Sequence, residues 1–129
     1  MSQLARKACT LMFEEHDFTD FFGIVSPLNE DACSYTYIRS RDGLRLEFTI
    51  FPLDGGAYTS VYRDDIAEPI IESRLTGCTH SRFTLHASRH CLEIGRPEHP
   101  NSETTAPLVW GLRLSIEPHF KIEYIHEIG

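Results

Sequence analysis

The sequence between residues 108 and 116 reads LVWGLRLSI, and its pattern decides the fold class. Large apolar side chains recur at every second position, with smaller or polar ones between them. This period of two is typical of a β-strand with one buried face. The alternation returns from Phe120 to Ile128, after the turn-like segment Glu117-Pro118-His119. The two stretches therefore predict an antiparallel pair of strands.

Similar alternation extends back to Ser34. Besides 108–116 and 120–128, we expect strands at 34–40, 44–51, 57–63, 70–76, 80–87 and 90–94. Turn residues separate these stretches, most clearly Asp42-Gly43, because an Asp-Gly pair adopts the positive φ of a tight hairpin. Short connections pair consecutive strands in order. The sequence thus predicts an antiparallel meander of seven or eight strands.

The N-terminal region has a different pattern. Residues 2–16 carry apolar side chains at helical spacing, and Ser2 is available as an N-cap, so we expect a helix there. Four phenylalanines follow closely, and we interpret this Phe-rich segment as a lid over one end of a sheet. Its members are Phe13, Phe18, Phe21 and Phe22.

The whole chain, 1–129, is expected to form one domain, with the helix and Phe-rich lid in 1–23 and the meander in 34–129. A polar stretch at 95–107 contains three prolines and predicts a long exposed loop. The fold class is mainly β, or α+β by count of elements. We favour a sheet curled into a barrel or half-barrel, with a two-sheet β-sandwich as the alternative.

The charge balance argues against two classes of partner. Nineteen acidic and twelve basic residues give a net charge of −7. Nucleic acids and anionic membranes both require a basic surface, so neither is an expected partner. The sequence shows no signal-peptide pattern and no long apolar run, so we expect a soluble cytoplasmic protein. Its four cysteines form no CxxC pair and are expected to be reduced.

The region from 78 to 91 is the densest in metal-ligand side chains, with Cys78, His80, His86 and Cys91. Thiolate and imidazole are the groups that zinc prefers. We predict a hairpin here with His86 opposite Cys91, and Leu85 opposite Leu92. The spacing matches no known zinc pattern, so no cofactor is predicted, and zinc at these four residues is kept as a minor hypothesis.

No catalytic residue can be assigned. Cys91 and His86 could form a nucleophile and base pair, but no orienting group or oxyanion site accompanies them. Two acidic clusters could hold a divalent cation, although a turn and a solvated helix end explain them equally well. The clusters are Asp64, Asp65 and Glu68, and Glu14, Glu15, Asp17 and Asp20.

Aromatic side chains with one polar atom are the remaining candidates for a binding site. Such residues serve as core residues, as walls of a ligand cavity, or as anchors of a protein interface. The candidates are Tyr35, Tyr37, Tyr58, Tyr62, Trp110 and Tyr124.

We favour a non-enzymatic protein-interaction module, whose acidic surface would suit a basic target protein. Small immunity or antitoxin-like proteins that neutralise basic nucleases have this general size and charge, which is an analogy of composition. The alternatives are a small-ligand-binding barrel or enzyme with an aromatic-lined cavity, and the metal protein. A homodimer is also compatible with the sequence, with 108–116 or 120–128 as a candidate edge strand.

Overall fold

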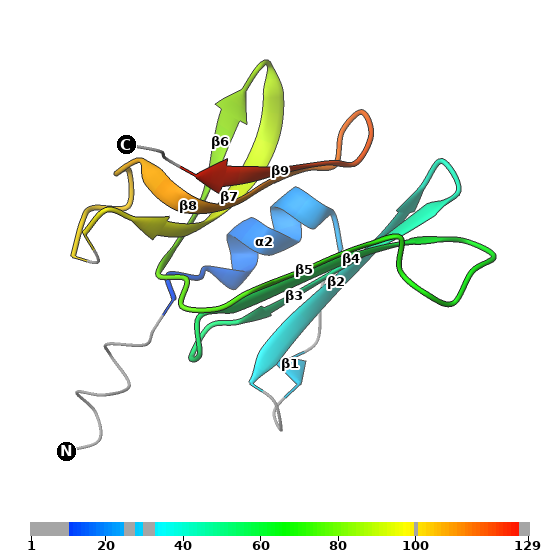
Figure 1. Ribbon diagram of the computed structural model, residues 1–129, viewed down its shortest axis with the longest axis horizontal. Coiled ribbons are helices and arrows are strands. Elements are labelled where there is room, and N and C mark those ends of the chain that lie inside the picture. The colour runs from blue at the N-terminus through cyan, green and yellow to red at the C-terminus, as the bar shows by residue number, and fades with distance from the viewer. Residues whose placement is uncertain (1–10, 25–27, 30–32, 100, 127–129) are drawn as a thin grey trace.

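The computed structural model describes residues 11–24, 28–29, 33–99 and 101–126 (Figure 1). Within these residues the protein is mainly β, with one short helix, α2 (Glu15–Phe22), and nine strands. The first five strands are β1 (Leu28–Asn29), β2 (Ser34–Arg41), β3 (Leu44–Phe51), β4 (Gly56–Arg63) and β5 (Ile71–Leu75). The other four are β6 (His80–His86), β7 (Arg89–Pro97), β8 (Leu108–Ser115) and β9 (Lys121–His126).

The strands form two antiparallel sheets, a first sheet in the order β1-β2-β3-β4-β5 and a second in the order β6-β7-β8-β9. Consecutive strands are neighbours within each sheet, so the predicted antiparallel meander is confirmed for each sheet separately. The prediction of a closed barrel is wrong, because β5 and β6 do not pair. The chain leaves the first sheet after Leu75, where Cys78 N–H donates to Gly55 O and Thr79 N–H donates to Gly95 O. These bonds direct the chain across to the second sheet.

Helix α2 lies between the two sheets (Figure 1). Phe18 shows this most clearly, because its ring centroid lies 6.3 Å from that of Phe48 in the first sheet and 5.1 Å from that of Phe83 in the second. Phe22, one turn later, is fully buried and stacks on Tyr37. The predicted lid over a sheet end is therefore wrong, since the i, i+4 spacing of Phe18 and Phe22 gives the helix an apolar face that both sheets cover.

The predicted helix at 2–16 falls mainly on residues outside the described part of the chain. Residues 11–14 are not helical, which contradicts that part of the prediction. Two of their backbone N–H groups donate to carbonyls that are distant in sequence instead. Leu11 N–H donates to Pro52 O at 2.7 Å, and Met12 N–H donates to Thr79 O at 3.1 Å. These tertiary hydrogen bonds override the local helical pattern. The helix ends at Gly23, whose φ of 74° favours glycine.

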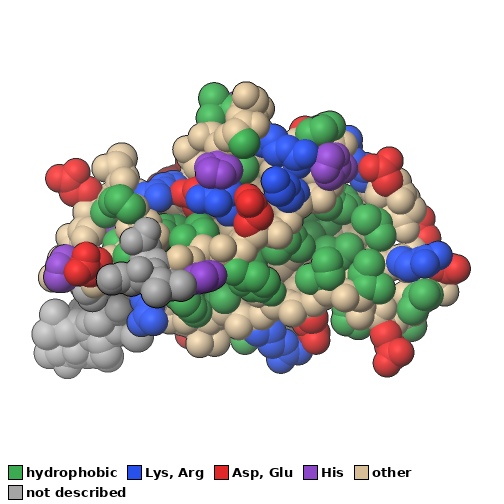
Figure 2. Space-filling view, turned by 45° about the horizontal axis from the view of Figure 1, so that its top comes forward, with side chains coloured by type: hydrophobic (Ala, Val, Ile, Leu, Met, Phe, Trp, Pro, Cys, Tyr) green, Lys and Arg blue, Asp and Glu red, His purple; other side chains and the backbone are tan. Residues whose placement is uncertain are grey.

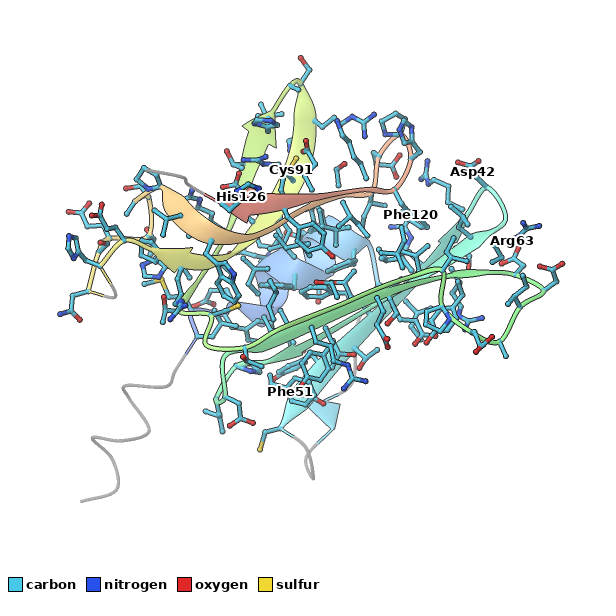
Figure 3. The ribbon with its side chains drawn as sticks, viewed as in Figure 1. Asp42, Phe51, Arg63, Cys91, Phe120 and His126 are labelled. Carbon is cyan, nitrogen blue, oxygen red and sulfur yellow. The ribbon has the colours of Figure 1, made fainter. Side chains whose placement is uncertain are left out.

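The alternating apolar side chains pack between the sheets. The fully buried ones include Leu46, Phe48 and Ile50 from β3 and Leu112 and Leu114 from β8. The residues that alternate with these point to the outer faces of the sheets. Figure 3 shows Phe51 on the outer side of the first sheet and Cys91 on the outer side of the second. The two inner faces together form one core around α2.

Several boundaries in the second sheet differ from the predictions. The β6–β7 hairpin turns at Ala87 and Ser88, which have φ values of 53° and 66°. This two-residue turn shifts the register by two residues, so Leu85 lies opposite His90 and Cys91 lies opposite Thr84. Strand β7 continues to Pro97, so the predicted loop at 95–107 starts later.

The edge strands of the second sheet are β6 and β9, while β8 lies inside it. The expectation of an edge at 108–116 is therefore wrong, whereas an edge beginning near 120 agrees with β9. Strand β8 pairs with β7 on one side and with β9 on the other, and its inner residues Leu112 and Leu114 are fully buried. No helix among the described residues has the length and apolar character needed to span a membrane.

Candidate protein-binding groove

An open groove of about 980 Å³ lies between α2 and the second sheet. The helix supplies one wall, β6 and β7 contribute Phe83 and His90, and the segment after β8 contributes Ile116 and Glu117. Thr104, in the connection between β7 and β8, also lines it. Four separate parts of the chain therefore meet at this groove.

The groove has an aromatic floor. Phe18 and Phe83 meet edge to face with ring centroids 5.1 Å apart, and Phe21 lies 5.2 Å from Phe83. Phe13 extends the cluster, with its ring centroid 4.8 Å from that of Phe18. Phe13, Phe21 and Phe83 are only partly buried, so their rings are accessible from the groove. An aromatic surface of this kind favours apolar stems and cations.

Carboxylates surround this floor. Glu14, Asp17 and Asp20 recur every third residue on the exposed side of α2 and its N-terminal flank, and Glu117 faces them from the other wall. Among the described residues, Glu14 and Asp17 form no ion pair, while Asp20 has only the exposed His16 at 3.4 Å. The rim is therefore a concentration of uncompensated negative charge beside an apolar floor.

Two arginines of the first sheet hold the wall that carries Glu117. The Arg41 guanidinium donates to a Glu117 carboxylate oxygen at 2.6 Å and to Pro118 O at 2.7 Å. Arg39 lies 3.8 Å from the same carboxylate and also donates to the Phe22 carbonyl at the end of α2. We call these contacts the inter-sheet latch, because they join β2 to the turn between β8 and β9.

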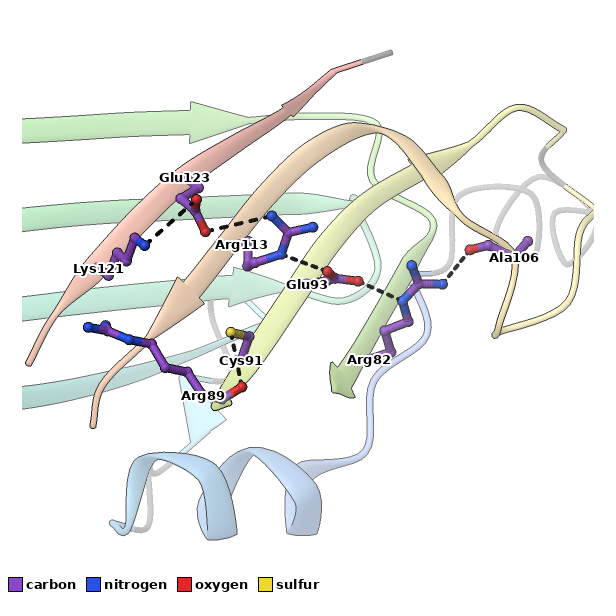
Figure 4. A network of polar contacts seen from close by, with 8 residues as sticks. All are labelled: Arg82, Arg89, Cys91, Glu93, Ala106, Arg113, Lys121 and Glu123. Carbon is purple, nitrogen blue, oxygen red and sulfur yellow. Dashed lines mark hydrogen bonds and ion pairs between the residues drawn. The ribbon is translucent and has the colours of Figure 1, made fainter. Parts of the chain in front are cut away.

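The outer face of the second sheet differs from the groove in its charge balance. A ladder of alternating charge crosses it: Arg82 and Arg113 donate to opposite oxygens of Glu93 at 2.9 and 2.8 Å, and Arg113 lies 3.6 Å from Glu123 (Figure 4). In Figure 2 a band of mixed basic, His and acidic side chains runs across the top of the molecule. The ladder neutralises its own charges, so it does not contribute to the acidic excess.

The predicted metal ligands do not come together. His80 and His86 stand at opposite ends of β6, six residues and about 20 Å apart at the usual rise of a strand. His80 is buried, and both its ring nitrogens have hydrogen-bond partners, Thr79 and Ser102 O. Cys78 is buried beside β4, and no three His, Cys, Asp or Glu side chains in the described part of the chain could hold a metal ion together.

Cys91 is not arranged as a nucleophile. Burial raises the pKa of its thiol, although Arg113 opposes the effect. The thiol donates a hydrogen bond to Arg89 O at 3.5 Å. A nucleophilic cysteine needs a lowered pKa and a base within reach, and His86 is paired across the hairpin with Arg89 instead.

The six predicted aromatic residues lie on three different surfaces. Tyr37 is in the core and Tyr35 is partly buried beside Phe13, so both face α2. Tyr58 and Tyr62 are on the outer face of the first sheet, where Arg74 and Arg45 stack on them. Trp110 and Tyr124 are on the second sheet, in β8 and β9. The Arg96 guanidinium lies over the Trp110 ring, and Tyr124 is the most accessible of the six, at 58% exposure.

None of those six residues lines the groove. Both the phenylalanines and the acidic residues of 13–21 stand out in the sequence, but their pattern predicts a lid and a solvated helix end. A usable signal was present in 17–21, because Phe21 follows Asp17 by four residues and so shares a helix face with it. That spacing places an aromatic ring and a carboxylate side by side on one surface of α2.

No protein-family model matches the sequence, and no curated protein matches it either. The fold is shared with a solved structure, a chain of the contact-dependent growth inhibition toxin - immunity protein complex from Klebsiella pneumoniae 342. The TM-score is 0.70, and the match covers 90% of this chain and 96% of that chain, at 15% sequence identity. The likeness establishes a common fold across nearly the whole length of both chains.

Proposed function

We propose that this protein is an immunity-type protein that binds a toxin and neutralises it. The observation that carries the proposal is the fold shared with a chain of a toxin - immunity protein complex over 90% of this chain. The match also covers 96% of that chain, so the shared fold extends over nearly the whole of both chains.

The charge of the chain supports the immunity side of such a pair. A net charge of −7 suits an antagonist that meets a basic target, because opposite charges speed association and favour the correct partner. The proposal includes a cytoplasmic location, where cysteines stay reduced. Two of the described cysteines, Cys78 and Cys91, are free thiols.

The test uses the genes beside the one that encodes this chain. Each neighbouring open reading frame is expressed in a host cell, alone and together with this chain. We expect one of them to arrest growth when expressed alone and growth to return when this chain is present. Native mass spectrometry of the co-expressed pair should then show one complex containing both chains.

A control separates specific neutralisation from the burden of a second protein. Phe48→Asp places a charge in the core, where Phe48 is fully buried, and should unfold the chain. This variant should fail to restore growth. The proposal is overturned if no neighbouring frame is toxic, or if the toxic one kills equally in the presence of folded wild-type chain.

A further inference from the structure

We infer that the groove between α2 and the second sheet is the site that receives the partner, and that it takes an arginine-rich segment of the toxin. This inference rests on the proposed function, since it assigns that function a surface and a partner chemistry. It combines three observations, which are the shape of the groove, its aromatic floor and its acidic rim.

The size of the groove fits side chains of another protein. Its volume of about 980 Å³ lies at the upper end of the range of about 300–1,000 Å³ that is usual for small-molecule sites. Because the groove is open and lined by the exposed side of a helix, it can admit a segment of a second chain. More than one side chain of that segment can enter it.

The floor and the rim together select the side chain. Phe21 and Phe83 line the groove and are only partly buried, and aromatic rings attract a cation and also cover an apolar stem. Asp17 and Glu14 stand next to these rings and form no ion pair within the described residues. Arginine meets both requirements, because its flat guanidinium stacks on aromatic rings and binds carboxylates through two hydrogen bonds.

The described arginines that line or border the groove do not neutralise the carboxylates of α2. Arg82 is committed to Glu93 and to the carbonyls of Thr104 and Ala106. Arg39 and Arg41 offset Glu117 alone. Within the described residues, Asp17 therefore has no paired cation and Asp20 has only His16. A second copy of this chain is a poor occupant, because each copy carries a charge of −7.

The first experiment uses hexa-arginine as the probe, with hexa-citrulline as an uncharged peptide of similar shape. Amide shifts are followed by NMR in the full-length protein. We expect hexa-arginine to shift residues of α2 together with Phe83 and His90, and we expect hexa-citrulline to shift none of them. Shifts that spread evenly over the acidic surface, or no binding at millimolar peptide, overturn the inference.

Matched variants separate the groove from the overall charge. Asp17→Lys with Asp20→Lys changes the rim, while Asp64→Lys with Glu68→Lys makes the same change of charge on exposed residues of the β4–β5 connection. The rim variant should weaken hexa-arginine binding by about tenfold, as expected when charges at the contact itself are reversed, and the control should change it by no more than about twofold. Equal effects overturn the inference.

Reversing charge at Asp17, in the first turn of α2, also weakens the helix itself. Asp17→Asn with Asp20→Asn is therefore measured beside it, and circular dichroism confirms that each variant is folded. The Asn variant should weaken binding by about threefold, since it removes attraction without adding repulsion. Sedimentation of the wild type should show a monomer. A dimer that the rim variant dissociates would place a second copy in the groove and overturn the inference.

The toxin distinguishes this inference from the proposed function. If wild type restores growth and the rim variant does not, while the Asp64 and Glu68 variant does, both stand. If the rim variant neutralises the toxin as well as wild type at equal protein level, the groove is not the site, although the function holds. If no neighbouring frame is toxic but hexa-arginine occupies the groove as expected, the proposed function fails and the cation site stands.

Discussion

Tyr37 is a fully buried tyrosine in the core between α2 and the first sheet. Burial, together with the nearby Glu15 carboxylate and Tyr35, raises the pKa of its phenol to about 12. A raised pKa means that the folded protein favours the protonated phenol of Tyr37. The free energy of unfolding therefore keeps its full value below the unfolded pKa of 10.0 and falls as the pH rises from there towards 12.

Tyr37→Phe should therefore remove one cause of alkaline unfolding. The Tyr37 hydroxyl has no hydrogen-bond partner that meets ordinary geometry in the described structure, so at pH 7 the variant should unfold within about 1 kcal/mol of wild type. Urea unfolding at a series of pH values checks this. Above pH 10 the wild type should lose stability relative to the variant, and a constant difference would contradict the assignment.

Glu93 is the buried carboxylate at the centre of the charge ladder. Burial acts to raise its pKa, but hydrogen bonds from Arg113 and Arg82 outweigh that effect and lower the pKa below 4.5. Glu93→Gln leaves both guanidinium groups without this carboxylate, so the free energy of unfolding at pH 7 should fall by about 2–4 kcal/mol. Glu123→Gln is the control, since its more exposed pair contributes only about 0.5 kcal/mol.

The effect of Glu93→Gln should also depend on pH. A lowered pKa means that the stability from Glu93 is present above the unfolded value and is lost as the pH falls through the folded one. Thermal melts should therefore show a wide gap between wild type and variant at neutral pH, and the gap should narrow as the pH falls below 4.5. A gap that stays constant over this range would show that Glu93 acts through packing alone.

At the scale of the elements, β7 and β8 approach each other closely at a pair of glycines. Gly95 and Gly111 lie opposite each other, and a Cβ built on Gly111 would lie 2.2 Å from the Ile94 carbonyl oxygen. Gly111 also has a φ of 154°. Any side chain there must force the two central strands of the second sheet apart.

Gly111→Ala should accordingly cost about 4 kcal/mol or prevent folding, as expected for a backbone clash in a core strand. Gly43→Ala is the matched comparison, because Gly43 has a φ of 75° and open space around it. It should cost only about 1 kcal/mol, from the left-handed conformation alone. Urea unfolding of both variants gives the measurement, and similar losses would mean that the close approach of the strands is not limiting.

Some elements follow the sequence pattern closely and others do not. Alternation predicted β3 to the residue and β8 within one residue, because one face of each strand is buried and a shift would expose it. The β6–β7 register failed because its turn residues, Ala87 and Ser88, adopt positive φ without glycine or asparagine to indicate it. The N-terminal helix failed at 11–14, where hydrogen bonds to Pro52 and Thr79 decide the conformation.

At the scale of the whole molecule, the groove could not be predicted, because it depends on how the two sheets are placed around α2. The Phe-rich segment and its acidic residues were visible in the sequence, but Phe83 and Ile116 reach them only through tertiary packing. The predicted tyrosines were dispersed for the same reason, since the two faces of a sheet separate Tyr37 from Tyr58. The acidic balance, by contrast, follows from the sequence without a fold, and the basic partner that it indicates stays a prediction.

The inter-sheet latch connects the two sheets on the side of the groove. Arg41 donates to Glu117 and Pro118 O, and its side chain is only 25% exposed. Arg41→Gln should lower the free energy of unfolding by about 1–2 kcal/mol, because a charge-assisted pair and a carbonyl contact are both lost. Arg45→Gln removes a pair within one strand, Arg45 to Glu47, and serves as the control.

Hydrogen exchange separates a general loss of stability from loosening of the groove wall. In Arg41→Gln, the amides of the β8–β9 turn and of the end of α2 should exchange faster than those of β3, because Glu117 is freed on one side and the sheets can separate there. Binding of hexa-arginine should weaken as well, since the two walls no longer keep a fixed spacing. If exchange rises uniformly and peptide binding is unchanged, the latch stabilises the fold without shaping the groove.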